Sequence, residues 1–312
     1  MPQTEIQRLL NDYLSYLEIE KNRSPKTREN YEHYLGVFLR FADIETPAEI
    51  TDHLVRDFRM SLSRPSAKPS GKNFRPGGSH TLKKITQGYY VIALRNFLKY
   101  LAKRDIPSLS PDKIELPKTP ARQIETITYE DLERLLAAPK EDTLRDLRDK
   151  AILETFFSTG LRLAELCSLD RYLDLKRGEL SVRGKGDKIR VVFLSPSAKE
   201  AIRRYLEKRA DAETALFVSI NKSGKIIGRI TPRSAERVVA FRSRQAGIIK
   251  PVHAHELRHS FATDLLMNGA DIRSVQELLG HANISTTQIY THLTDQQLRE
   301  IHKTFHGKRR EE

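Results

Sequence analysis

The sequence of 312 residues contains one cysteine, Cys167, and no internal repeat at the periods typical of solenoids. A single cysteine excludes an internal disulfide framework and any zinc site built from cysteines alone, and it suits a reducing compartment. No run approaches the ~18 apolar residues that a membrane helix requires. The polar start MPQTEIQRLLNDY lacks the apolar core of a secretory signal. We therefore expect a cytoplasmic protein with no membrane partner.

Acidic residues are missing from one long stretch, residues 59–104, which holds eleven lysines and arginines. The whole chain carries 54 Lys and Arg against 41 Asp and Glu, a formal net charge of +13. A surface that only confers solubility usually mixes both signs, so we interpret the stretch as a phosphate-contacting surface. The expected partner is nucleic acid rather than a membrane surface.

One predicted helix in this stretch supplies the candidate phosphate contacts, Arg95, Lys99 and Lys103. Their i, i+4, i+8 spacing places them on one helical face. Five apolar residues are expected to pack inward from the opposite face: Ile85, Tyr89, Ile92, Leu94 and Leu98.

Hydrophobic spacing predicts a mostly helical chain of two domains. In residues 1–104 it predicts four amphipathic helices, which cover residues 6–17, 25–41, 48–62 and 81–102. A basic loop rich in Pro, Gly and Ser, residues 64–80, separates the last two, and its role stays open. The four prolines of residues 105–123 predict an extended linker. Residues 124–312 form the second domain.

The second domain is predicted to be α+β, with a small antiparallel sheet. Thr128 caps its first helix, and a helical pattern covers residues 149–169 apart from a break at Thr159–Gly160. Residues 179–183 and 189–194 flank a Gly-Lys-Gly-Asp turn and predict a hairpin. Beyond residue 195 the pattern is helical, with one short strand at 215–220.

The segment HAHELRH contains H-E-x-x-H, the signature of zinc proteases, at His255–His259. The extended form of that motif needs Gly and His where this chain has Ala262 and Leu265. Arg258 would also place a cation beside the metal, which electrostatics disfavours. A zinc hydrolase therefore remains a minor alternative.

Several other residues suit the handling of phosphate. His255 and Arg258 lie three apart on one side of a helix start, and arginine binds phosphate oxygens in a bidentate fork. Arg162 follows a glycine break, and Lys185 lies between two glycines of the hairpin turn. His281 precedes Tyr290 by nine residues in LLGHANISTTQIYTH. Taken singly, each has a structural explanation, as a surface ion pair, a solvated turn or a core tyrosine.

Together, STGLR, RGKGDKIR, HAHELRH and LLGHANISTTQIYTH resemble the tyrosine recombinase family, and its Xer chromosome-resolving members most closely. The resemblance implies a four-helix, SAM-like core-binding domain that clamps DNA and an α+β catalytic domain with the tyrosine recombinase fold. It also implies a complete catalytic set: Arg162, Lys185, His255, Arg258, His281 and Tyr290.

The resemblance assigns a role to each of these residues. Tyr290 is the nucleophile that forms a 3′-phosphotyrosyl bond, and the two arginines hold the non-bridging oxygens. The two histidines donate hydrogen bonds and exchange protons, while Lys185 protonates the leaving 5′ oxygen. No cofactor and no metal ion are implied.

The expected function is site-specific recombination, with Xer-type resolution of chromosome or plasmid dimers during segregation and cell division. The implied partners are double-stranded DNA and other recombinase protomers, identical or paralogous, in a tetrameric synapse. Three alternatives stay open: a mobile-element or phage integrase of the same family, a type IB topoisomerase, and a non-catalytic DNA-binding protein. The sequence does not specify the DNA target.

Overall fold

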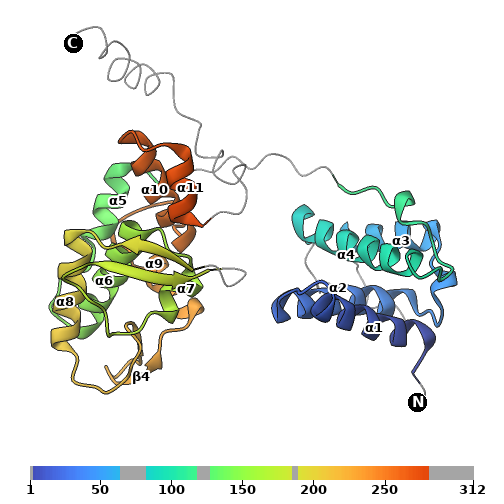
Figure 1. The fold of residues 1–312 in the computed structure, drawn as a ribbon, viewed down its shortest axis with the longest axis horizontal. Coiled ribbons are helices and arrows are strands. Elements are labelled where there is room, and N and C mark those ends of the chain that lie inside the picture. Colours follow the sequence, from blue (N-terminus) through green and yellow to red (C-terminus); the bar gives the residue numbers. More distant parts are fainter. Residues whose placement is uncertain (1–2, 64–81, 118–126, 185–188, 281–312) are drawn as a thin grey trace, which may run out of the picture. The chain divides into compact units, whose positions relative to one another are not determined.

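The computed structural model describes residues 3–63, 82–117, 127–184 and 189–280 (Figure 1). The chain divides into two compact units, Met1–Arg122 and Gln123–Glu312. Each unit has a hydrophobic core of its own.

Four α-helices form the first unit, as the hydrophobic spacing predicts. They are α1 (Glu5–Ile19), α2 (Pro25–Ala42), α3 (Asp52–Ser63) and α4 (Lys84–Ala102). Thr4 and Gln7 form a capping box that begins α1. Ser24 caps α2 by accepting a hydrogen bond from the amide of Thr27. α3 begins four residues later than predicted because Pro47–Glu49 form a separate 3₁₀ turn, η1.

The exposed side of α4 differs from the prediction. Leu94 and Leu98 are buried as predicted. Three apolar side chains predicted to lie in the core are instead exposed: Ile85 (50 %), Tyr89 (47 %) and Ile92 (36 %). Residues seven positions apart return to the same side of a helix, so Ile92 and the exposed Lys99 share a face. The outer face of α4 is therefore apolar in its first half and cationic toward its end.

The segment 105–123, whose prolines predict an extended linker, is packed against the first unit over its described part. Its turn η2 (Pro111–Lys113) contacts α4, and Ile114 is 2 % exposed within the first core. Arg95 Nε donates to the carbonyl of Pro111 at 3.1 Å, and Arg59 Nη1 donates to that of Glu115 at 3.3 Å. The extended-linker prediction is therefore wrong for residues 105–117, while 118–123 lie outside the described residues.

The described part of the second unit is mostly helical, with two small antiparallel hairpins (Figure 1). Its helices are α5 (Tyr129–Leu136), α6 (Leu144–Thr159), α7 (Leu163–Ser168), α8 (Pro196–Lys208), α9 (Pro232–Gln245), α10 (Ala254–Met267) and α11 (Ile272–Leu279). Its strands are β1 (Glu179–Arg183), β2 (Ile189–Phe193), β3 (Val218–Ile220) and β4 (Ile226–Arg229). Thr128 caps α5 as predicted. Within the described ranges, no helix is long and apolar enough to cross a membrane.

The first hairpin matches the prediction and the second does not. β1 and β2 pair antiparallel, with Leu180 opposite Val192 and both side chains buried. The pattern predicts a single strand at 215–220, but β3 pairs with β4, which the pattern does not reveal. β4 has only four residues, one of them glycine, so it shows too little alternation to be detected.

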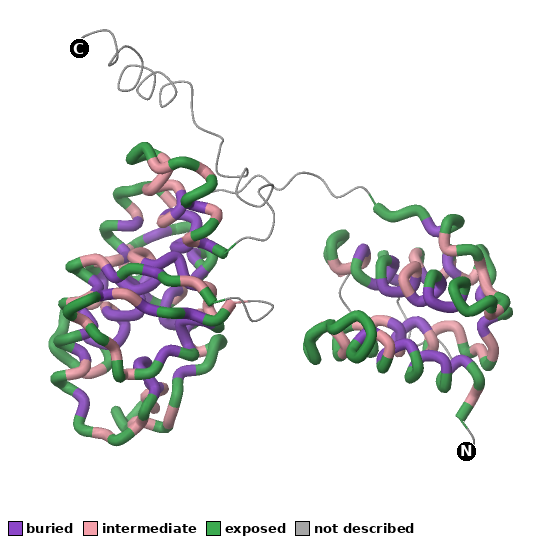
Figure 2. The backbone as a smooth tube through the Cα atoms, in the orientation of Figure 1, coloured by how far each residue is buried: buried purple, intermediate pink, exposed green. Residues whose placement is uncertain are grey.

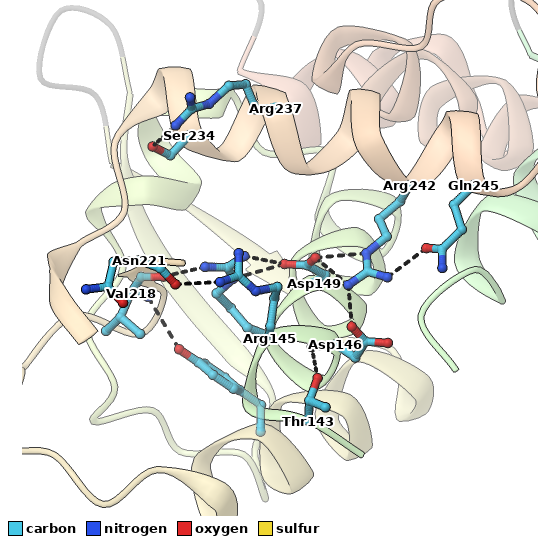
Figure 3. Close-up of polar contacts among 12 residues, drawn as sticks. Thr143, Arg145, Asp146, Asp149, Val218, Asn221, Ser234, Arg237, Arg242 and Gln245 are labelled. Carbon is cyan, nitrogen blue, oxygen red and sulfur yellow. Dashed lines mark hydrogen bonds and ion pairs between the residues drawn. The ribbon is translucent and has the colours of Figure 1, made fainter. Parts of the chain in front are cut away.

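α6 is the central helix of the second unit and is buried along most of its length (Figure 2). It packs against α5, α8, α9 and α10. Two of its aspartates bind Arg242 of α9, with Nη2 at 2.6 Å from Asp146 Oδ1 and Nε at 2.8 Å from Asp149 Oδ2 (Figure 3). Arg242 is only 2 % exposed. Buried charges require such partners, so this network fixes α9 on α6.

The helix break predicted at Thr159–Gly160 is confirmed. Gly160 ends α6 in the left-handed conformation, with φ of 58°. A Cβ atom there would lie 2.4 Å from Cδ1 of Phe261, so this turn requires glycine. The tight turn places Arg162 at the N-cap of α7.

Candidate active site

Arg258 lies in α10 and joins the ends of two other helices. Its side chain is buried, with the residue 2 % exposed. Nη1 donates to the carbonyl of Gly160 at 2.6 Å, and Nη2 donates to that of Leu279 at 2.6 Å. These carbonyls belong to the final turns of α6 and α11, where no intrahelical donor remains for them. Arg258 is therefore held rigidly by backbone groups.

Arg162 lies next to the same helix ends. Its backbone amide donates to Glu165 Oε2 at 2.8 Å, and its Nη1 donates to Glu165 Oε1 at 2.9 Å. Nη2 donates to the carbonyl of Gly280 at 2.9 Å. These contacts use two of the five N–H donors of the guanidinium group, whose side chain is 34 % exposed. Arg162 can therefore bind an anion with its outer edge.

Glu165 also binds a third arginine, Arg190 of β2, which sequence reasoning missed. Arg190 Nη1 donates to Glu165 Oε1 at 2.9 Å, and Nη2 donates to Oε2 at 2.7 Å. The Arg190 side chain is 11 % exposed. Two signals in the sequence point to this pair: the i, i+3 spacing of Arg162 and Glu165, and an arginine at an inward position of a strand.

The environment of Glu165 keeps it ionised. Burial raises the pKa of its carboxyl group, but hydrogen bonds from Arg190 and Arg162 and the positive charge of Arg190 outweigh burial. The pKa consequently falls to about 2.

The end of α11 is surrounded by three arginines. Each donates to one of its last carbonyls: Arg190 to Leu278 (2.9 Å), Arg258 to Leu279 (2.6 Å) and Arg162 to Gly280 (2.9 Å). A helix C-terminus carries a partial negative charge that attracts cations. Three guanidinium groups and one carboxylate give this site a local formal charge of +2 (3 − 1), which suits an anionic group such as a phosphodiester.

His255 lies beside His259 at the start of α10. Their rings meet edge to face, with centroids 4.3 Å apart. His255 is exposed, whereas His259 is 1 % exposed. Glu256, which a zinc protease would use as its base, instead accepts from the backbone amide of His253 at 2.9 Å. Among the described residues, no group of three metal-ligating side chains occurs.

Three of the predicted catalytic residues, Lys185, His281 and Tyr290, lie outside the described residues. Lys185 belongs to the segment between β1 and β2, and His281 directly follows Gly280. The structure thus brings together Arg162 and Arg258 and places His255 in the same helix as Arg258.

The candidate DNA contacts on α4 fall into two kinds. Lys99 and Lys103 are exposed. Arg95 is instead engaged with η2, because it donates to Pro111 and its Nη2 lies 3.5 Å from Asp112 Oδ1. Of the three, the two lysines are therefore the more exposed to solvent.

Cys167 lies in α7, five residues after Arg162, and belongs to the core of the second unit. The residue is 6 % exposed, and burial raises the pKa of its thiol to about 11. The thiolate is the nucleophilic form, so Cys167 acts as a small core residue.

Comparison with known proteins identifies relatives of both units. Residues 125–297 match the phage integrase family, and residues 10–75 match the phage integrase N-terminal SAM-like domain. The chain is 36 % identical to tyrosine recombinase XerC of Thermodesulfovibrio yellowstonii, over 97 % of each chain. It is 37 % identical to tyrosine recombinase XerD of Listeria innocua, over 96 % of this chain and 98 % of the relative.

Solved structures show the same architecture. The crystal structure of XerA recombinase aligns with a TM-score of 0.51 and 31 % identity, covering 96 % of this chain and 98 % of its own. The XerH site-specific recombinase, in a post-cleavage complex with its palindromic difH substrate, aligns with a TM-score of 0.65 and 22 % identity, covering 93 % and 82 %. The predicted fold class, a SAM-like helical domain followed by an α+β catalytic domain, is confirmed.

Proposed function

The chain belongs to the phage integrase family and, as a tyrosine recombinase, cleaves and rejoins DNA at specific sites; we propose that it does so through a covalent bond between Tyr290 and a 3′ phosphate. The roles of the individual residues and the biological setting are part of this proposal.

The observation that carries the proposal is the anchoring of Arg162 and Arg258 by the ends of α6 and α11. Cleavage of a phosphodiester develops negative charge on the non-bridging oxygens. Cations that are already held in place stabilise this charge without the cost of reorganising at the moment of reaction. Two guanidinium groups held in this way therefore provide electrostatic stabilisation for the cleavage of a phosphodiester.

The remaining roles follow the resemblance. The hydroxyl oxygen of Tyr290 attacks phosphorus, the bond from phosphorus to the 5′ oxygen breaks, and Lys185 supplies the proton to that oxygen. His255 and His281 donate hydrogen bonds and exchange protons near neutral pH, and one of them accepts the proton that the Tyr290 hydroxyl gives up. A 5′ hydroxyl from a second strand reverses the step, because the phosphotyrosyl bond conserves the energy of the original bond.

We place the reaction in the cytoplasm, in an assembly of recombinase protomers on double-stranded DNA. The similarity to XerC and XerD supports a role in resolving chromosome or plasmid dimers. Integration of a mobile element is the second candidate, since integrases belong to the same family.

Covalent capture tests the proposal and identifies the target. The protein is incubated with random double-stranded DNA, and the covalently retained fragments are sequenced. We expect one enriched sequence with the wild-type protein and none with Tyr290→Phe. A plasmid with two copies of that sequence should then be resolved into two circles. Relaxation of a one-site plasmid without strand exchange would instead indicate a topoisomerase.

Chelation tests the metal-free chemistry. Because the arginines supply the charge that a metal ion would supply, we expect excess EDTA to leave the rate of covalent capture unchanged. Loss of capture in EDTA, with recovery on adding zinc, would favour the zinc alternative suggested by H-E-x-x-H at His255–His259.

A further inference from the structure

Arg190 connects three elements of the candidate active site. It lies in β2, binds both carboxylate oxygens of Glu165 in α7 at 2.9 and 2.7 Å, and donates from Nε to Leu278 at the end of α11 at 2.9 Å. These partners are 25 and 88 positions away in the sequence. The fork geometry fits only arginine, because one planar group must reach a carboxylate and a carbonyl in different directions.

Arg190 also governs how strongly Glu165 holds Arg162. Each oxygen of Glu165 accepts a hydrogen bond from both arginines, with the bond from Arg162 to Oε2 coming from its backbone amide. Without Arg190, the full charge of the buried carboxylate would fall on Arg162, and the formal charge of the cluster would drop from +2 to +1. Arg162 would then be drawn toward Glu165 and would offer less positive charge to a phosphate.

We propose that Arg190 is a positioning residue for strand cleavage, which orients Arg162 through Glu165 and holds the end of α11 beside it. The inference rests on the proposed function. Nε, Nη1 and Nη2 of Arg190 are all engaged with Leu278 and Glu165, and in this proposal Arg190 acts on cleavage through these two neighbours.

Arg209 provides a matched control. Its side chain is fully buried, and it binds both oxygens of Asp211 and the carbonyl of Leu216, as Arg190 binds Glu165 and Leu278. Within the described part of the chain, its hydrogen-bond partners lie two to seven residues further along, in the segment after α8, and none of them belongs to the candidate site. Removing a buried arginine should lower the stability of both Arg190→Gln and Arg209→Gln. An effect on positioning should slow cleavage in Arg190→Gln alone.

The experiment measures single-turnover cleavage of a nicked target site, which traps the protein covalently. The rate is taken for the fraction of protein that reacts, so that partial unfolding does not distort it, and DNA affinity is measured separately. We expect Arg190→Gln to slow cleavage by about 10–100-fold, the scale of a misplaced catalytic group. Affinity should stay within about threefold, because the lost interaction acts in the transition state. Arg209→Gln should lower the unfolding temperature and leave the rate unchanged.

Two further variants separate positioning from a general structural effect. Arg190→Lys keeps the charge but loses the fork, so its rate should fall between those of the wild type and Arg190→Gln. The double variant Arg190→Gln with Glu165→Gln should cleave no more slowly than the slower of the two single variants. Both changes break the same connection, which runs from Arg190 through Glu165 to Arg162.

Three results would overturn the inference: a wild-type rate for Arg190→Gln, multiplicative slowing in the double variant, or equal slowing by Arg209→Gln. If the wild-type protein itself forms no covalent complex with any DNA, the proposed function fails and the inference fails with it.

Discussion

Glu165 is the carboxylate that neutralises part of the charge of the candidate active site, and its ionisation links the site to pH. Its pKa is lowered from 4.5 to about 2, so folding favours the ionised form. The resulting stabilisation is fully present above pH 4.5, the unfolded value, and is lost as pH falls toward 2. A shift of this size corresponds to roughly 3 kcal/mol.

We therefore predict that the stability advantage of the wild type over Glu165→Gln shrinks below pH 4.5. The difference in free energy of unfolding between the two proteins should fall by up to about 1.4 kcal/mol per pH unit. Urea denaturation from pH 6 to pH 3 measures it, with Glu133→Gln as an exposed control. A difference between wild type and Glu165→Gln that stays constant over this range would contradict the assignment.

Residue types and spacing predict only part of the candidate site. Arg162 and Arg258 are predicted because their segments, taken together with the others, resemble the tyrosine recombinase family, and the structure brings both to the ends of α6 and α11. Arg190 gives only a weak signal in the sequence, its inward position in a strand, because its partners lie 25 and 88 residues away. Contacts that depend on how elements pack leave no local pattern.

At the scale of elements, α4 combines exposed apolar side chains with exposed lysines on its outer face. The alternation of apolar and polar residues along α4 fits two helical faces, and only packing against α1, α2 and α3 selects the inner one. This is why the positions of Ile85, Tyr89 and Ile92 were predicted wrongly, although the helix itself was predicted correctly.

We predict that Lys99→Ala and Lys103→Ala each weaken the salt dependence of DNA binding. Each should reduce the slope of log K against the log of the salt concentration by about 0.9, the contribution of one phosphate contact. Arg95→Ala should change the slope less, because its side chain is already engaged with Pro111 and Asp112. Binding titrations between low and moderate salt measure these slopes. Lys208→Ala, which loses a lysine paired with Asp142, is the control. If neither Lys99→Ala nor Lys103→Ala changes the slope, this face of α4 does not contact DNA phosphates and is only a solvated surface.

At the scale of the whole molecule, the sequence predicts two domains, and the structure divides into two compact units, Met1–Arg122 and Gln123–Glu312. The proline count of residues 105–123 argued for an extended linker. Ile106, Leu109 and Ile114 nevertheless pack against the first core. Isolated apolar residues in a proline-rich segment carry no periodicity, so their burial could not be predicted from a pattern.

A fragment of residues 1–117 should accordingly be more stable than one of residues 1–104. The shorter fragment loses Ile114, whose burial contributes about 2 kcal/mol, along with the contacts of Ile106 and Leu109. For a unit of this size the loss should lower the unfolding temperature by about 10 °C or more. Circular dichroism melts of the two fragments measure it, and equal melting temperatures would show that the segment adds nothing to the first unit.

The central claim is that Tyr290 becomes joined to DNA. A target site nicked close to the cleavage point loses its short leaving strand, so the covalent intermediate accumulates and can be digested and identified by peptide mass. The account predicts a single adduct, on Tyr290, attached to a 3′ phosphate, and none with Tyr290→Phe despite unchanged DNA affinity. An adduct on another of the eleven tyrosines, or continued adduct formation by Tyr290→Phe, would contradict it.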